Sequence, residues 1–428
     1  MAQTILSFKL EKTDETISAH AGLALLGEYM RGLRVEEHLD RALPAPGSGA
    51  GYKPSQFVLP LLLMLNGGGR SLEDLRQIRS DEGLKRLLEL DDMPSSDATG
   101  DWLKRMGEGK GLLGLAGVNR GLLKRALKHD GIKEYTLDID ATQIIAEKDE
   151  AKWTYKGERG YMPIVGHLAE NGLVVGDEFR EGNESPGSRN LEFVKHSRRQ
   201  MPKGKRIKNL RADSASYQAS IFNYCEEKGI KFAIGADLDE GVQKSIGTIK
   251  ADKWEAYGDG QIAETIHSMN KTDKAFRLIV IRHATQGEMF GETRYRYTVI
   301  GSNRRENAKE TVKWYNQRGE ASENRIKELK IGFGMERMPC GTMKANAVFF
   351  RIGVMAYNVF VMFKRSTLPA EWRRQQVQTV RWRLYQTAGK VVEHARQLML
   401  KVSGTAFSLF EEVRTRCAEF FWISPSPA

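Results

Sequence analysis

Apolar residues recur at three- and four-residue spacing through the first 130 residues of the chain. Residues 22–43 carry this helical period, and the apolar run at 54–65 ends in a glycine cluster that would stop a helix. Ser71 is a suitable N-cap for a further helix at 71–78. These features predict a helical domain over residues 1–130.

After this region the pattern changes to the alternation typical of strands. Three β-rich runs lie at residues 134–142, 162–170 and 172–182, and the "ENG" turn between the last two predicts a hairpin. A helical pattern then precedes a strand that ends at Asp213, and a further helix and strand follow. This order predicts a mixed α/β sheet over residues 131–240, with chemistry at the strand ends.

The remaining residues divide into three regions. Residues 241–305 alternate apolar and polar positions and are rich in β-branched and aromatic side chains, which predicts an antiparallel, β-rich insertion. Residues 306–368 return to a helical period and complete the core. Within them, residues 347–363 are the most apolar, but they fall short of the roughly 20 residues that span a bilayer, so we expect a buried core helix and no membrane span. Residues 369–428 are basic and are expected to be mostly helical.

The charge balance favours a polyanionic partner. The chain holds 66 Lys+Arg against 55 Asp+Glu, a net charge of +11, and nucleic acid is the leading candidate because phosphate contacts dominate its binding. The helical region 1–130 is then a candidate DNA-binding domain, with a structural bundle as the alternative. A basic run at residues 195–208, just before the Asp213 strand, suits either contacts to phosphates that lead into the Asp213 site or a solvated loop. Its candidate DNA contacts are Arg198, Arg199, Lys203, Lys205 and Arg206.

Several common kinds of site find no support. The three cysteines are far apart and form no CxxC pair, which argues against a disulfide framework and against a zinc ribbon. The sequence contains no glycine-rich nucleotide-binding loop, no HExxH motif and no GxSxG elbow. No secretory signal is recognisable at the N-terminus, so we expect a reducing, cytoplasmic environment.

The remaining candidates for chemistry are acidic. In "LDIDAT", Asp138 and Asp140 project from the same face of a strand, and Asp140 stands at the strand end, as Asp213 does in "LRADSA". Carboxylates gathered at neighbouring strand ends repel one another unless a cation lies between them, and Mg²⁺ or Mn²⁺ is the natural partner of oxygen ligands. A strand-end aspartate that caps the following helix is the alternative for either residue.

A third acidic position follows in the segment "YNQRGEASENRIKELK" at residues 315–330. If this segment is a helix, Glu323, Lys327 and Lys330 lie along one stripe. An acid with basic neighbours suits a site that holds both metal and phosphate. A solvated surface helix with ion pairs between successive turns is the alternative.

Taken in order, "LDIDAT", "LRADSA" and "YNQRGEASENRIKELKIGFG" resemble the three signatures of insertion-sequence DDE transposases. The match is to the insertion-sequence 1380 group of the insertion-sequence 4 superfamily, and it covers residues from about 130 to 365. The resemblance implies a ribonuclease H-like core whose catalytic and metal-binding acids are Asp140, Asp213 and Glu323. Two Mg²⁺ or Mn²⁺ ions per active site would support strand cleavage and strand transfer.

The resemblance also implies DNA contacts. Tyr315, Arg318 and Lys330 match the tyrosine, arginine and lysine of the superfamily signature, with Lys327 beside them. Four residues separate Arg318 from Glu323 where the family has three, and Glu320 with Lys327 keeps the same acid-to-lysine spacing as Glu323 with Lys330. Trp254 in the insertion is a candidate for stacking on an unpaired base, with an ordinary half-buried aromatic as the alternative.

The expected protein is therefore a bacterial, nucleoid-associated transposase that binds double-stranded DNA at terminal inverted repeats and at a target, and pairs two ends as a homodimer. Two alternatives remain open. One is a ribonuclease H-like nuclease without strand transfer, and the other is a domesticated, non-catalytic DNA-binding protein.

Overall fold

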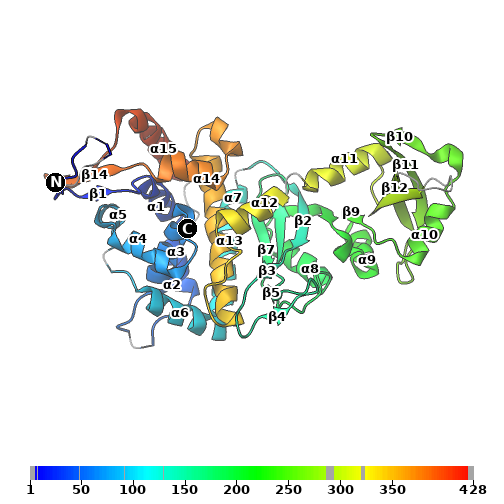
Figure 1. Cartoon of the computed structure of the whole chain (residues 1–428), viewed down its shortest axis with the longest axis horizontal. Helices are drawn as coiled ribbons and strands as arrows, with labels where there is room; N and C mark the ends of the chain where they lie inside the picture. The colour runs from blue at the N-terminus through cyan, green and yellow to red at the C-terminus, as the bar shows by residue number, and fades with distance from the viewer. Residues whose placement is uncertain are drawn as a thin grey trace.

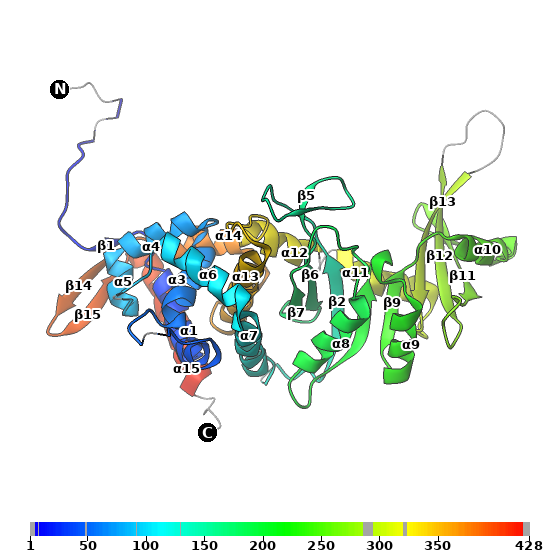
Figure 2. The same cartoon turned by 90° about the horizontal axis from the view of Figure 1, so that it is seen from below.

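The computed structural model describes an elongated molecule with three parts in a row (Figures 1 and 2). A helical body lies at one end, a mixed sheet with flanking helices lies in the middle, and a β-rich lobe lies at the other end. The described residues are 5–6, 8–47, 49–90, 92–128, 130–285, 294–319 and 323–422.

The helical body contains the helices that the periodicity of the first 130 residues predicts. Their order is α1 Leu23–Gly32, α2 Val35–Ala42, α3 Pro54–Gly67, η1 Leu72–Asp74, α4 Leu75–Ser80, α5 Glu82–Leu88, α6 Ser96–Glu108 and α7 Gly111–Lys128. Trp102 of α6 stacks on Phe57 of α3 with ring centroids 4.9 Å apart, and both are buried in one continuous core. Burial of such large apolar faces is the main stabilising term in a helical body of this kind.

The C-terminal region folds onto this same body, and a β-hairpin that the sequence did not suggest interrupts its helices. Its elements are η6 Ala370–Arg374, α14 Val377–Val380, the π-helical turn η7 Arg381–Tyr385, β14 Gly389–His394, β15 Gln397–Lys401 and α15 Gly404–Trp422. Strand β14 pairs with β15 and with β1, Ile17–Ser18. The hairpin turns through Ala395 and Arg396 with φ of 51° and 65°. Because such turns normally carry Asn or Gly, the sequence gives no hairpin signal there.

The central sheet has nine strands in the order β10-β11-β12-β13-β9-β8-β2-β6-β7. Its core strands are β2 Glu134–Ala141, β6 Ile164–Leu168, β7 Val174–Glu178, β8 Arg206–Ala212 and β9 Lys231–Gly235. Strands β2, β8 and β9 are parallel, and β2, β6 and β7 pair antiparallel. This is the predicted mixed α/β sheet, and the predicted "ENG" hairpin joins β6 to β7.

Smaller elements flank these core strands. Helices α8 Asn190–Gln200 and α9 Ala219–Lys228 lie between them along the chain. A separate small sheet combines β3 Ile144–Ile145, β4 Lys152–Trp153 and β5 Arg159–Tyr161.

The predicted β-rich insertion extends the central sheet and is not a detached module. It comprises α10 Glu240–Gly247, η3 Ala251–Lys253, β10 Glu255–Tyr257, β11 Gly260–His267, β12 Phe276–Thr285 and β13 Arg294–Ser302. Strand β13 pairs antiparallel with β9 through Ile300 and Gly235. The backbone hydrogen-bond ladder therefore runs without a break from the insertion into the core.

Three helical segments complete the core. Helix α11 Ala308–Arg318 leads from the insertion toward the end of β2 (Figure 1). Helix α12 Asn324–Lys327 continues into the π-helical turn η5 Glu328–Gly332. Helix α13 Met343–Ser366 runs between the helical body and the sheet. In the described part of the chain it is long and apolar enough to cross a membrane, but 94% of its most apolar window is buried inside the protein, as expected for a core helix.

Candidate active site

Asp140 and Asp213 lie at the same edge of the central sheet. Strands β2 and β8 are parallel neighbours, with Asp138 aligned to Arg211, and each of the two acids follows its register pair by two residues. Because parallel strands end at a common edge, the two carboxylates emerge side by side. Both residues are only partly exposed to solvent, so their charges are incompletely hydrated.

Arg318, the last residue of α11, reaches the same edge from above the sheet. Its Nη2 lies 3.3 Å from Oδ1 of Asp140 and donates a hydrogen bond of 3.3 Å to the carbonyl oxygen of Ile139. The side chains of Arg318 and Asp140 are 11% and 21% exposed. The guanidinium is thus an internal cation of the site, and not the displayed DNA contact that the sequence suggests.

Tyr315 lies one helical turn before Arg318 and packs against the end of β9. Its hydroxyl donates to the carbonyl oxygen of Ala212, 3.3 Å away and next to Asp213. At Gly235 an added Cβ would lie 3.1 Å from the Tyr315 hydroxyl and 3.2 Å from the backbone nitrogen of Ser214. The glycine therefore permits the close approach of β9, α11 and the Asp213 turn.

At this edge the charges of two other acids act on Asp140. Burial raises the pKa of Asp140 to about 6, Arg318 opposes this shift, and the nearby charges of Asp213 and Glu323 add to it. Burial also raises the pKa of Asp213, again against the effect of Arg318. The burial of Arg318 lowers its own pKa, but Asp140, Tyr315 and Asp213 outweigh that effect and raise it. The structure thus brings Asp213 and Glu323 within electrostatic range of Asp140.

Three further predicted site residues follow α11 in the chain. Glu323 and Lys327 are exposed. Lys330 is partly buried, and its Nζ donates to the carbonyl oxygen of Gln143 at 2.8 Å. Burial lowers the pKa of Lys330, and Asp140 is among the charges that oppose this shift. Glu320, the alternative third acid, lies outside the described residues.

The donors at this edge suit a hard divalent ion, although their present spacing is not that of a metal-bound site. The three acids offer only carboxylate oxygens, which are the ligands that Mg²⁺ and Mn²⁺ prefer. Among the described residues, no group of three or more His, Cys, Asp or Glu side chains is arranged to hold a metal ion. Arg318 lies beside Asp140 at this edge, and the carboxylates match such a metal in the chemistry of their oxygen donors.

Nearly the whole chain matches a known protein family. Residues 5–417 match the family described as transposase DDE domain group 1. The chain belongs to this transposase family. No curated protein matches the chain. As a DDE transposase the protein is an endonuclease and transferase that acts on DNA, in a family that generally uses divalent metals.

In this transposase, the basic run before β8 lies at the opposite edge of the sheet, so the expectation that it leads into the Asp213 site is wrong. Strand β8 begins at Arg206, and an extended strand of this length separates Arg206 from Asp213 by roughly 20 Å. Arg206 pairs with Glu134 at the start of β2. The sequence places this run next to Asp213 along the chain, and the strand carries it away in space.

The side chains of the basic run differ in how far they are exposed to solvent and in whether they already have a partner. Lys205 is 13% exposed, and its Nζ lies 2.8 Å from Oδ1 of Asp130, so it is an internal ion pair and not a surface contact. Arg198 donates to the Tyr224 hydroxyl and lies over that ring. Arg199 and Lys203 are exposed, and a DNA contact by either stays a prediction.

Trp254 of the transposase is half-buried against the main core, at the base of β10. The guanidinium carbon of Arg282 lies 3.8 Å from the centroid of its ring and 4.4 Å from that of Tyr295. One face of the indole is therefore covered by an arginine that is sandwiched between two aromatic rings. Stacking of Trp254 on a base stays a prediction and would use the remaining surface of the ring.

Sequence reasoning missed the role of Arg211. Its side chain is 2% exposed and forms a fully buried ion pair with Asp138. A further hydrogen bond of 2.6 Å runs from Nη1 to the carbonyl oxygen of Trp314, in the turn of α11 that precedes Arg318. The available signal was a pair of opposite charges flanked by apolar residues, Asp138 in "LDI" and Arg211 in "LRA", because charges are buried only when paired.

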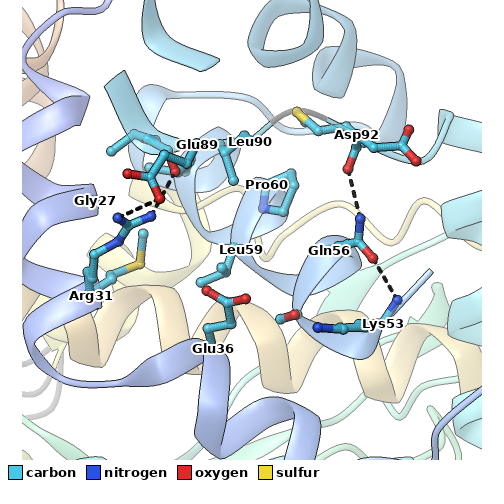
Figure 3. Close-up of a pocket in the computed structure, with 15 residues that line it drawn as sticks. Gly27, Arg31, Glu36, Lys53, Gln56, Leu59, Pro60, Glu89, Leu90 and Asp92 are labelled. Carbon is cyan, nitrogen blue, oxygen red and sulfur yellow. Dashed lines mark hydrogen bonds and ion pairs between the residues drawn. The ribbon is translucent and has the colours of Figure 1, made fainter. Parts of the chain in front are cut away.

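A cavity of about 320 Å³ lies in the helical body and is separate from these acids. In Figure 3, Gln56 bridges the backbone oxygen of Asp92 and the backbone nitrogen of Lys53. Arg31 lies 3.0 Å from Glu89. No residue of the strand-end site lines the cavity, which offers no chemistry of its own.

Proposed function

We propose that this transposase binds the terminal inverted repeats of its own element, cleaves the DNA there and joins the freed ends to target DNA. We assign it to the insertion-sequence 1380 group of the insertion-sequence 4 superfamily, with a ribonuclease H-like core. The observation that supports the proposal is the position of Asp140 and Asp213 at the ends of two neighbouring parallel strands, with the charge of Glu323 acting on Asp140. Helix α11 brings Tyr315 and Arg318 to the same edge.

In this proposal Asp140, Asp213 and Glu323 hold two Mg²⁺ or Mn²⁺ ions. When bound, such ions activate a water or a 3′-hydroxyl and stabilise the leaving oxygen of a phosphodiester. The protein orients the DNA: the exposed Lys327 and the partly buried Lys330 contact phosphates beside the acids. Tyr315 supports the Asp213 turn through its bond to Ala212. Two copies of the chain pair two DNA ends as a homodimer, in the bacterial nucleoid.

The proposal is tested by cleavage of an inverted-repeat duplex in Mg²⁺. Asp140→Asn, Asp213→Asn and Glu323→Gln should each abolish cleavage while leaving duplex binding within a few-fold of the unaltered protein. Glu192→Gln on α8, an exposed acid away from the site, is the matched control and should cleave normally. Undiminished cleavage by the Asp140→Asn variant would overturn the assignment.

The two alternatives give different results in the same assay. Cleavage without covalent joining of the cut end to a second DNA would indicate a nuclease. Sequence-specific binding without cleavage by the unaltered protein would indicate a silent DNA-binding protein. Joined products from the unaltered protein, lost in the three acid variants, support the transposase.

A further inference from the structure

Arg318 differs from the other arginine of the sheet edge in how completely its guanidinium is bound. Arg211 donates two hydrogen bonds to Asp138 and one to the carbonyl oxygen of Trp314, at 2.6 to 2.8 Å. Among the described residues, Arg318 has one ion pair and one hydrogen bond, both at 3.3 Å through Nη2. Its buried Nε has no hydrogen-bond partner in that same part of the chain. Arg211 is therefore locked in place, and Arg318 is held mainly by charge.

Two of the charges that act on Arg318 are those of proposed metal ligands. Asp140 has the largest effect in favour of its cationic form, and Tyr315, Asp213 and Asp138 add to it. A cluster of partly buried carboxylates is unstable without a positive charge among them, because each acid is only partly hydrated and repels the others. In this structure the guanidinium provides that charge.

A divalent ion and the guanidinium compete for the same carboxylate. Asp140 Oδ1 is the atom that faces Arg318, and a metal ion bound to this carboxylate would repel the guanidinium beside it. We propose that Arg318 is a resident counter-ion, which holds Asp140 in place before the divalent ion binds and is displaced from Asp140 when the ion binds. The inference rests on the proposed function, since it takes Asp140 as a metal ligand.

This positioning role also explains why the sequence suggests a DNA contact where the structure has an internal ion pair. Once displaced, the guanidinium is a free planar cation beside the acids and can pair with a DNA phosphate. The Arg318 side chain then pairs with Asp140 before the divalent ion binds and with a DNA phosphate afterwards. Metal binding would thus make the arginine available to the substrate.

The test measures metal binding without DNA and without catalysis. Titration calorimetry with Mn²⁺ alone compares the unaltered transposase with Arg318→Gln. Removal of the competing charge should tighten Mn²⁺ binding about tenfold. In EDTA the same variant should melt at a lower temperature than the unaltered protein, and Mn²⁺ should raise its melting temperature by more than it raises that of the unaltered protein.

Two further variants isolate the contact. Arg305→Gln removes the same charge at an exposed position before α11 and should leave Mn²⁺ affinity unchanged. Asp140→Asn should weaken binding, and adding Arg318→Gln to it should bring much less than the tenfold gain, because the two side chains act through each other.

The outcomes separate the inference from the proposed function. Mn²⁺ binding by the unaltered protein with no gain in Arg318→Gln overturns the counter-ion role alone. Absence of Mn²⁺ binding in both proteins overturns the counter-ion role and the metal site together. If Arg318→Gln does not fold even in Mn²⁺, Arg318→Lys replaces it. That variant keeps the charge but not the planar fork, so about threefold tighter binding is expected, and unchanged affinity overturns the inference.

Discussion

The carboxylate of Asp138 accepts two hydrogen bonds, of 2.7 and 2.8 Å, from the guanidinium of Arg211 on the neighbouring parallel strand. Neither side chain is more than 2% exposed. The pair holds β2 against β8, and Arg211 fastens α11 to the sheet through Trp314. The two aspartates of the same strand face therefore have different tasks: Asp138 fixes the scaffold, and Asp140 meets Arg318 at the edge.

Asp138→Asn should mainly reduce stability, because it leaves a buried guanidinium without its counter-charge. The expected loss is roughly 3 kcal/mol in the free energy of unfolding, measured by urea denaturation. Glu134→Gln on the same strand breaks the exposed pair with Arg206 and should cost less than about 1 kcal/mol. Asp138→Asn should retain more cleavage activity per folded molecule than Asp140→Asn. The reverse order would indicate that Asp138, and not Asp140, is the metal-binding acid of this strand.

Cleavage should fall as the pH drops through about 6, well above the range of an ordinary aspartate. Burial raises the pKa of Asp140 to about 6, so below that pH the carboxyl binds a proton and loses affinity for a divalent ion. The linkage to stability has the opposite direction. A raised folded-state pKa stabilises the protein at low pH, and that contribution is lost as the pH rises through about 6.

The pH dependence of cleavage and that of stability can be measured separately. The difference in unfolding free energy between the unaltered protein and Asp140→Asn should shift between pH 4 and 6 in favour of the unaltered protein at the acidic end. A cleavage profile with its acid limb near the usual aspartate pKa would contradict the assignment of Asp140 as the buried metal ligand.

Gly235→Ala should reduce cleavage without unfolding the protein. The added Cβ would lie 3.1 Å from the Tyr315 hydroxyl and 3.2 Å from the Ser214 nitrogen, so either α11 or the Asp213 turn must shift by a few tenths of an ångström. A loss on the order of tenfold in the cleavage rate is expected, because catalytic groups tolerate little displacement. Gly247→Ala, where an added Cβ meets no atom within 4 Å, should be silent in the same assay.

Replacement by methionine should destabilise the protein at Lys205 but not at Lys203. Lys205→Met removes the partner of Asp130 and should destabilise the protein by about 1–3 kcal/mol in thermal or urea unfolding. Lys203→Met changes an exposed side chain and should leave stability within about 0.5 kcal/mol. If Lys203 touches DNA, its loss should also reduce the salt dependence of binding by about one phosphate contact. Equal stability of the two variants would contradict the buried pair.

The parts of the structure that local sequence patterns specify were predicted. Periodicity located the helices of the first 130 residues and the core strands of the sheet, since side-chain alternation directly records which face is buried. The strand-end position of Asp140 and Asp213 followed from the same alternation. Their grouping at one edge required only that the two strands run in parallel.

Other features depend on pairings between distant segments. Nothing in the alternation of residues 231–235 and 294–302 specifies that β9 pairs with β13, so the insertion was expected as a separate region. The basic run was assigned to the wrong edge because proximity in sequence was taken for proximity in space across a strand. Arg318 was expected to face DNA, since a sequence does not indicate which anion an arginine meets first.

The unbroken hydrogen-bond ladder from β7 to β10 has a mechanical consequence. A lobe joined to a core by a flexible linker can search for its substrate, whereas strands of one sheet move only by bending or twisting together. DNA bound by the outer strands would therefore stay at a nearly constant distance from the carboxylates at the end of β2. The continuous sheet would then fix the distance between that contact and the proposed cleavage site.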